Sequence, residues 1–354
     1  MKKLKVGIIG ATGMVGQRFV QLLENHPWFE IKALAASEKS KGKTYKEAVR
    51  NRWKMNPPIP EFLENEILLG CVSDCKKICQ SVDFVFCALN MEKNELKELE
   101  YTYAKNDCPV ISNNSAHRWT EDVPILIPEI NPEHIKIIDI QRKRLKTKKG
   151  FIATKPNCSL QCFLPAIFPL MKFGIKSVIV STYQAISGSG KTFAEFPEIE
   201  DNIIPYISGE EEKTENEPFK ILGYLDDDKI VTCKKFDITS SCVRVPVSDG
   251  HLASVFVEFE KEVSENEIID IWENFNPIKL PSSPKKLIKY FSKSDRPQTR
   301  LDRNRDNGMG FNIGRLQKYE KNKIKFICMS HNTIRGAAGG AILFSELLYD
   351  KGYL

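Results

Sequence analysis

Two cysteines stand four residues apart in the segment PNCSLQC, which begins at Pro156. Pro156 and Asn157 predict a turn, and the residues from Ser159 to Leu170 predict a helix, so Cys158 is expected at a helix N-terminus. Free N–H groups and the helix dipole at such a position favour a thiolate and lower the thiol pKa. Cys162 falls one turn deeper and is expected in the core. Taken alone, the segment still favours a structural cysteine, because free cysteines are commonly buried.

A second segment, SCVRVPVSDGH from Ser241 to His251, adds groups that complement a nucleophile. It places Arg244 on a predicted strand and His251 just beyond a predicted turn. Arginine offers a two-pronged donor for a carboxylate, and histidine can carry protons near neutral pH. With a reactive Cys158 and a dinucleotide site, these residues predict a thiol-dependent oxidoreductase acting on an aldehyde or acyl group.

The dinucleotide site is predicted from glycines near the N-terminus. Gly10, Gly13 and Gly16 follow a predicted strand, 4–9, and open a predicted helix, 15–25. In this context backbone N–H groups can approach a pyrophosphate at the helix N-terminus, although the spacing departs from G-x-G-x-x-G. The expected cofactor contacts here are Gly10, Thr12, Gly13, Met14 and Val15.

The end of the second predicted strand indicates which dinucleotide binds. Enzymes that use NAD usually carry Asp or Glu there, whereas this chain has Ala35, Ala36 and then Ser37. The hydroxyls of Ser37 and Ser40, with lysines between and after them, suit a 2′-phosphate, so NADP is predicted. Glu38 stands one position late and leaves NAD as the alternative.

A competing signal is the loop AISGSGKT, from Ala185 to Thr192, which follows a predicted strand and ends like a phosphate-binding loop. Its first position is alanine, and no later strand ends in an Asp suited to Mg²⁺. A nucleotide-binding ATPase or regulator is therefore kept as an alternative from another class. Cys71, Cys75 and Cys79 lack zinc-site spacing and the five histidines are dispersed, so no metal is predicted.

These residues must be positioned by two kinds of structure. Apolar runs at 4–9, 30–36, 82–89 and 110–112 alternate with helical patterns, which predicts a parallel sheet. Later runs at 177–184, 241–247 and 252–259 are longer and alternate, which predicts an antiparallel sheet with one covered face. The architecture is expected to change near residue 157. The predicted fold class is α/β, with a Rossmann-like dinucleotide-binding domain and an α+β catalytic and dimerisation domain.

Composition excludes several classes of protein. The 354 residues suit about two domains, and no apolar run approaches the ~18 residues of a membrane span or forms a secretion signal. Ten cysteines without such a signal indicate reduced thiols, so a cytoplasmic location is expected. The net charge of +6 is mild, and the basic run 142–149 lacks aromatic residues, so neither a membrane nor a nucleic-acid partner is predicted.

Six segments together resemble one protein family. GATGMVG, PNCS, QAISGSG, IPYISGEEEK, RVPVSDGH and HNTIRGAAGG occur in the order found in aspartate-semialdehyde dehydrogenases, in particular their archaeal and fungal branch. The resemblance covers essentially the whole chain. It implies that Cys158 is the acylated nucleophile and His251 the acid/base. It further implies substrate contacts from Arg244 to the α-carboxylate, Glu210 to the amino group, Lys213 and Arg118 to the phosphate, and Gln184 as an orienting residue, and cofactor contacts from Ser187, Gly188 and Asn332.

The same resemblance implies a reaction and an organisation. Cys158 would attack 4-phospho-L-aspartate, phosphate would leave, and NADPH would reduce the thioester to L-aspartate 4-semialdehyde, at the entry to lysine, threonine and methionine synthesis. Residues 1–157, completed by 331–354, would form the cofactor domain, and 158–330 the catalytic and dimerisation domain of a homodimer or homotetramer. Reduction of malonyl-CoA by a relative with the same Cys and His is the nearest alternative. Glu210, Glu211 and Glu212 leave open which glutamate contacts the substrate.

Overall fold

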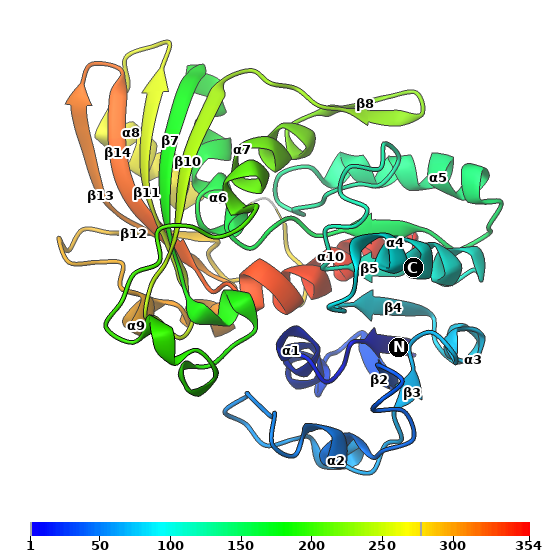
Figure 1. The fold of residues 1–354 in the computed structure, drawn as a ribbon. Coiled ribbons are helices and arrows are strands. Elements are labelled where there is room, and N and C mark those ends of the chain that lie inside the picture. The colour runs from blue at the N-terminus through cyan, green and yellow to red at the C-terminus, as the bar shows by residue number, and fades with distance from the viewer. Residues whose placement is uncertain (1, 277) are drawn as a thin grey trace.

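The computed structural model describes residues 2–276 and 278–354, and its first half is built on a parallel sheet (Figure 1). Within the described residues this sheet has six strands in the order β3-β2-β1-β4-β5-β6. Their bounds are β1 (Leu4–Ile9), β2 (Phe29–Ala36), β3 (Leu69–Gly70), β4 (Phe84–Cys87), β5 (Val110–Ser112) and β6 (Ile152–Thr154). The order reverses between β1 and β4, the position where open α/β sheets bind nucleotides.

Helices cover both faces of the parallel sheet, because successive strand residues point to opposite sides. Ile8 belongs to one apolar cluster with residues of α1 (Met14–Leu23), α5 (Ile137–Leu145) and α10 (Gly339–Asp350). Ile9 belongs to the other, with residues of α3 (Cys75–Ser81) and α4 (Lys93–Lys105). A short helix, α2 (Tyr45–Val49), follows β2 in the chain. Figure 1 shows the red C-terminal helix α10 returning to lie beside this half of the molecule.

The second half is built on a mixed sheet, ordered β10-β7-β11-β14-β13-β12 among the described residues. Its strands are β7 (Ile175–Gln184), β10 (Asp237–Arg244), β11 (His251–Phe259), β12 (Ile288–Phe291), β13 (Phe311–Glu320) and β14 (Lys323–Ser330). The prediction of an antiparallel sheet was wrong in part. β11 runs antiparallel to β7 and β14, but β10 runs parallel to β7, and β12 parallel to β13.

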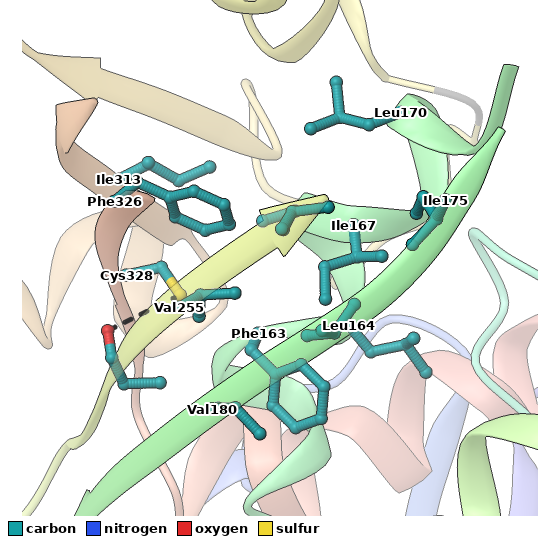
Figure 2. Packing of buried hydrophobic residues seen from close by; sticks show 14 of the residues in the cluster. Phe163, Leu164, Ile167, Leu170, Ile175, Val180, Val255, Ile313, Phe326 and Cys328 are labelled. Atoms are coloured by element: carbon teal, nitrogen blue, oxygen red, sulfur yellow. Dashed lines mark hydrogen bonds between the residues drawn. The ribbon is translucent and has the colours of Figure 1, made fainter. Parts of the chain in front are cut away.

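One face of the mixed sheet is covered and the other is open. Figure 2 shows Val180 of β7, Val255 of β11 and Phe326 of β14 packed against Phe163 and Ile167, which lie in the helical turns after Cys158. A helix, α8 (Glu265–Asn274), adds the buried Trp272 to this core. On the opposite face, large apolar side chains remain exposed: Ile179, Tyr183, Phe256 and Tyr319.

The segment after Cys158 differs from its prediction as one helix. It forms a 3₁₀ turn at Leu160–Cys162, then α6 (Leu164–Ile167), then a 3₁₀ stretch at Phe168–Phe173. Pro165 and Pro169 fall within it, and proline supplies no backbone N–H for a continuous helix. The spacing of apolar residues therefore predicted correctly that this segment is buried, but wrongly that it forms one continuous α-helix.

The remaining elements are one longer helix, α7 (Glu210–Ile221), and three short elements. The short ones are α9 (Thr299–Asp302) and a hairpin of β8 (Tyr224–Asp226) and β9 (Lys229–Val231). No helix in residues 2–276 or 278–354 is both long and apolar enough to cross a bilayer.

Candidate active site

Cys158 and His251 meet where the two sheets approach each other. Cys158 lies in the turn that follows β6, and His251 is the first residue of β11. Cys158 Sγ lies 3.4 Å from His251 Nε2. Gly336 lies against the cysteine, since a Cβ built on it would come within 3.0 Å of Cys158 Cβ. The C-terminal segment therefore packs directly on the thiol.

The other nitrogen of His251 is fixed by the backbone. The Ala185 N–H donates to His251 Nδ1 over 3.1 Å. Burial, with smaller effects from Arg244 and His331, holds the pKa of His251 well below its usual value. The ring is therefore neutral at pH 7, with its lone pair on Nδ1 and its hydrogen on Nε2, facing the sulfur.

The Cys158 thiol is protonated in the free enzyme. Burial is the largest cause, and Glu210 the next, of a pKa raised to about 11. Lys155, Arg244 and Arg118 oppose this rise. The prediction of a lowered thiol pKa was wrong, because only a three-residue 3₁₀ turn follows Cys158 and desolvation of this half-buried residue outweighs the nearby cations.

Lys155 is a buried lysine three residues before the nucleophile, and its charge interacts with that of Cys158. Its side chain is 1% exposed, and its Nζ donates to the Pro156 carbonyl at 3.0 Å. Burial lowers the pKa of Lys155 to about 7, while Cys158 is the largest influence in the opposite direction. Lys155 was not among the predicted site residues.

Arg244 and His251 both pack against Gly188. A Cβ at Gly188 would fall 2.7 Å from Arg244 Nη1 and 3.1 Å from His251 Cε1. Arg244 also donates to the Ala185 carbonyl at 2.7 Å. The glycine-rich loop thus packs on the arginine and histidine, which is a different arrangement from a phosphate-binding loop that opens a long helix.

Of the three consecutive glutamates, Glu210 points to the cysteine side. Its carboxylate accepts hydrogen bonds from Asn157 Nδ2 at 2.9 Å and Gln184 Nε2 at 3.3 Å, and pairs with Lys213 at 3.0 Å. Glu211 instead accepts from the Cys242 backbone N–H, and Glu212 is exposed. Four residues near the thiol, Asn157, Gln184, Glu210 and Lys213, are therefore linked in one network.

Arg118 lies behind this network. Its guanidinium is buried and pairs with Glu217 at 2.7 Å, and it also donates to the carbonyls of Lys155 and Asn113. Glu217 in turn accepts from the Asn157 N–H at 2.8 Å. Glu217 balances the charge of Arg118. Lys213, whose side chain is 32% exposed, is the more accessible of the two cations.

Two of the three N-terminal glycines are required by close packing around the β1–α1 turn. Gly10 has φ +94°, and a Cβ there would fall 2.5 Å from the Ala88 carbonyl. Gly16 packs α1 onto the β1 turn so closely that a Cβ would collide with the Gly10 carbonyl. A Cβ at Gly13 would make only an ordinary contact with the Gly10 carbonyl, at 3.6 Å, and Gly13 precedes α1 without a side-chain cap. The first N–H groups of α1 are thus accessible to an anion such as a pyrophosphate.

The side chains after β2 divide into two groups. Glu38 is occupied, since its carboxylate accepts from the Ser73 hydroxyl at 2.8 Å and from the Ser73 N–H. Ser37 is exposed, whereas Ser40 is buried. The carboxylate that could have favoured NAD is therefore directed to the segment after β3, and Ser37 is left facing solvent.

Ser187 and Asn332 tie the two halves of the site together. Asn332 Nδ2 donates to Ser187 Oγ at 2.9 Å, and Asn332 Oδ1 accepts from the Gly250 N–H at 2.8 Å. Asn332 is 2% exposed. It therefore fixes the loop that carries Gly188 relative to the turn that carries His251.

Sequence reasoning missed Asn157, Lys155, Glu217 and Ala185. Asn157 and Lys155 flank Cys158 closely enough that their neighbourhood was a usable signal. Ala185 acts through its backbone, and Glu217 through a long-range pair with Arg118, so neither leaves a mark in the sequence. Cys162 is fully buried and donates to the Ser159 carbonyl, as predicted for a core residue.

Family models match both halves of the chain. Residues 5–138 match the NAD binding domain of semialdehyde dehydrogenases, and residues 167–335 match their dimerisation domain. An aspartate-semialdehyde dehydrogenase of Archaeoglobus fulgidus is 43% identical over 349 residues, covering 99% of each chain. The enzyme of that name from Aspergillus fumigatus is 40% identical over 365 aligned residues, again with 99% of each chain covered.

Solved structures agree with these matches. The aspartate-semialdehyde dehydrogenase of Candida albicans, solved with NADP, superposes with a TM-score of 0.89 at 36% identity over 100% of both chains. Another from Vibrio cholerae, complexed with ASA, gives a TM-score of 0.76 at 25% identity over 99% of this chain and 100% of that one. The site geometry, both family models and the full-length relatives place this chain in the aspartate-semialdehyde dehydrogenase family.

Proposed function

We propose that this protein catalyses the NADPH-dependent reductive dephosphorylation of 4-phospho-L-aspartate to L-aspartate 4-semialdehyde, for lysine, threonine and methionine synthesis. Membership of the family supports this activity. The observation that carries the proposal is the 3.4 Å contact between Cys158 Sγ and His251 Nε2, with Arg244 against the same glycine loop. These groups supply a nucleophile, a donor to it and a carboxylate anchor.

Arg244 and Glu210 divide the recognition of an amino-acid substrate between them. Arg244 is buried, and among the described residues its side chain donates one hydrogen bond, to the Ala185 carbonyl, so it keeps donors for the α-carboxylate. The Glu210 carboxylate would accept hydrogen bonds from the substrate ammonium group. Gln184, which donates to Glu210, would orient the part of the substrate between its carboxylate and ammonium groups. A substrate without an amino group would leave Glu210 with Lys213 as its only ion-pair partner among the described residues.

The leaving phosphate needs positive charge near Cys158. Lys213 and Arg118 supply it, with Lys213 the more accessible of the two. As the Cys158 sulfur forms its bond to the acyl carbon, the carbon–oxygen bond to phosphate breaks, and these cations stabilise the departing anion.

His251 serves the sulfur as a hydrogen-bond donor. Its Nε2–H faces the sulfur and its Nδ1 is occupied by the Ala185 N–H, so the resting ring has no lone pair to take the thiol proton. As the thioester forms, the proton of the resting Cys158 thiol leaves with the phosphate as HPO₄²⁻. Collapse of the thiohemiacetal then returns a thiolate, so in this scheme His251 stabilises the sulfur without carrying a net proton. The acid/base role expected from the sequence stays a prediction, and the donor role proposed for the resting ring resembles the use of neutral imidazoles as electrophiles in other enzymes.

The residues present fit NADP. Gly13 leaves the N-terminus of α1 open to the pyrophosphate, Ser37 is available to the 2′-phosphate, and Glu38 is directed away to Ser73. Thr12, Met14 and Val15 belong to the same turn and helix start, and Ser187, Gly188 and Asn332 approach from the other half. When bound, NADPH supplies the hydride that reduces the Cys158 thioester.

The chain is a dimer through its second half. Ile179 and Phe256 pair on adjacent strands of the open sheet face, with exposed fractions of 56% and 37%. An apolar face of this kind is typical of an isologous interface. We assign residues 1–157 with 331–354 to the cofactor domain, since α10 completes its core, and 158–330 to the catalytic and dimerisation domain. All ten cysteines are free, which suits the reducing cytoplasm.

One assay tests the activity. The purified protein is given L-aspartate 4-semialdehyde, phosphate and NADP⁺, and NADPH formation is followed by absorbance. A parallel reaction contains malonyl-CoA and NADPH. We expect turnover of the semialdehyde that depends on phosphate. Turnover with malonyl-CoA alone would overturn the proposal.

A further inference from the structure

A cleft of about 880 Å³ lies between α1 and the catalytic half, away from the proposed site residues. Its walls come from α1, the segment 281–285, the segment 303–309 and the start of the C-terminal segment. None of the residues proposed above to contact substrate or NADP lines it. The molecule therefore has a second concave surface between its two halves.

Charged groups of both signs face this cleft. Arg18 lines it, and among the described residues its Nε is buried with no hydrogen-bond partner. Arg303 donates to the Ser248 hydroxyl and the Asp249 carbonyl, each at 3.0 Å, and the Asp249 side chain also lines the cleft. A buried donor without a partner is costly, which makes Arg18 a position where a ligand oxygen would be stabilising.

His331 adds a neutral polar group. It is 3% exposed, and burial lowers its pKa to about 4, so its ring is uncharged at pH 7. Lys54, another lining residue, is already paired with Glu195 at 2.7 Å. Asp306 also lines the cleft, and its carboxylate is already paired with Arg305. The charges left to a ligand are therefore the two arginines and the carboxylate of Asp249, with Glu24 and Lys285 exposed at the rim.

One part of the cleft lining is apolar, although the lining as a whole is more polar than apolar. Leu22, Met309 and Ile334 belong to one small hydrophobic cluster, and all three line the cleft together with Ile342. A pocket with an apolar floor and a few converging polar groups is the usual form of a small-molecule site.

We propose that this cleft binds an aliphatic α-amino acid, with its carboxylate on Arg18 and Arg303, its ammonium group on Asp249 and its side chain on the floor of Leu22, Met309 and Ile334. A simple anion would bind the two arginines but leave Asp249 without a partner, and a simple cation would be repelled by the two arginines. A ligand that carries both charges and an apolar tail complements the arginines, Asp249 and the apolar residues together.

The cleft is connected to the catalytic residues through two short segments. Asp249 stands two residues before His251, and His331 immediately precedes Asn332. The Gly250 N–H, between Asp249 and His251, donates to Asn332 Oδ1. A ligand that engages Arg303 and Asp249 therefore contacts the same turn that leads to His251.

Isothermal titration calorimetry on the full-length protein tests the binding. L-leucine, L-isoleucine, L-norleucine and L-methionine are titrated, beside isocaproate, which lacks the ammonium group of leucine, and isoamylamine, which lacks its carboxylate. We expect at least one amino acid to bind and both truncated analogues to bind at least tenfold more weakly. Failure of all four amino acids to bind at millimolar concentration overturns the proposal, as does equal binding of isocaproate.

Variants then locate the site. Arg18→Gln should weaken the amino acid tenfold or more, and Leu22→Trp should block it by filling the floor, whereas Arg50→Gln, an exposed arginine of the same half, should leave it unchanged. Arg244→Lys separates this site from the proposed active site, and it should also leave binding unchanged. Loss of binding in Arg244→Lys, with binding retained in both Arg18→Gln and Leu22→Trp, would place the amino acid in the active site and overturn the inference.

Discussion

The Ala185 backbone N–H donates to Nδ1 of His251, and this one bond decides which nitrogen of the ring carries hydrogen. The hydrogen must then be on Nε2, which lies 3.4 Å from Cys158 Sγ. A backbone group that cannot be changed by a side-chain substitution thus determines the role of the histidine toward the nucleophile.

The tautomer of His251 is directly measurable. Because the chain has five histidines, ring ¹⁵N signals of labelled protein can be assigned by comparison with His251→Gln. We expect a neutral ring with hydrogen on Nε2 at pH 7, and it should stay neutral as the pH falls below 6.5, since burial lowers its pKa. An imidazolium at pH 7, or hydrogen on Nδ1, would show that His251 acts as a proton acceptor for the thiol.

Replacement of the two cysteines should have separate effects. Cys158→Ala should abolish turnover and leave NADP affinity nearly unchanged, because the sulfur forms the covalent intermediate and not the cofactor site. Cys162→Ala should retain activity and cost about 1 kcal/mol of unfolding free energy, as small core truncations do. Steady-state kinetics, NADP titration and denaturant unfolding measure these outcomes. Residual activity in Cys158→Ala above a trace, or alkylation of Cys162 in the native enzyme, contradicts the assignment.

The pH dependence of alkylation reports the thiol pKa. Burial raises the pKa of Cys158 to about 11, so the neutral thiol dominates below that value and the thiolate fraction grows about tenfold per pH unit. Inactivation of the free enzyme by iodoacetamide should therefore keep accelerating above pH 8. A rate that levels off below pH 8 would indicate the activated thiolate that the sequence alone predicted.

Cofactor preference should depend on Ser37. Ser37→Asp places a carboxylate where the 2′-phosphate is proposed to bind, and charge repulsion should weaken NADPH and shift preference toward NADH. Ser40 is buried, so Ser40→Ala should affect stability as well as affinity and is the less informative change. The ratio of kcat/KM for the two cofactors is the measurement. Equal kinetics with NADH and NADPH in the unaltered protein would count against NADP specificity.

Substrate recognition is tested by one pair of variants. Arg244→Lys keeps the charge but loses the two-pronged geometry, and should raise KM for the semialdehyde by tens of fold or lower kcat with it. Glu210→Gln should weaken the same substrate, since a charge-assisted hydrogen bond contributes about 1.5–3 kcal/mol. Glu211→Gln is the matched control, because its carboxylate binds the Cys242 backbone. If neither glutamine variant changes the kinetics, Glu210 does not bind the amino group.

Much of the first half could be predicted from sequence because its signals are local. The predicted strands at 4–9 and 110–112 coincide with β1 and β5, and Gly10, Gly13 and Gly16 lie at the predicted strand-to-helix turn. Strand direction in the second half could not be predicted. The alternation of buried and exposed residues in β10 indicates which face of the strand is buried, but not that β10 lies beside β7 and runs parallel to it. The helical pattern after Ser159 carried a signal that was overlooked, namely Pro165 and Pro169.

The site also divides into features with a local sequence signal and features that depend on the fold. Cys158, His251, Arg244 and Glu210 could be proposed from residue types and motifs, and the structure brings them together. The electrostatics could not be predicted, because the thiol pKa depends on burial and on Lys155 and Glu210, which only the fold places around it. The same holds for the Ala185 N–H, which every residue except proline possesses.

The last residues of the chain complete the first domain. Ala341, Ile342, Phe344 and Leu348 of α10 are buried in the same cluster as Val6 and Ile8 of β1, and Gly336 rests on Cys158. During synthesis the first domain must therefore wait, with part of its apolar surface uncovered, until α10 has been translated. Gly336 can reach Cys158 only after the whole mixed sheet has been synthesised, so a chain that stops before Gly336 would lack both this contact and part of the first core.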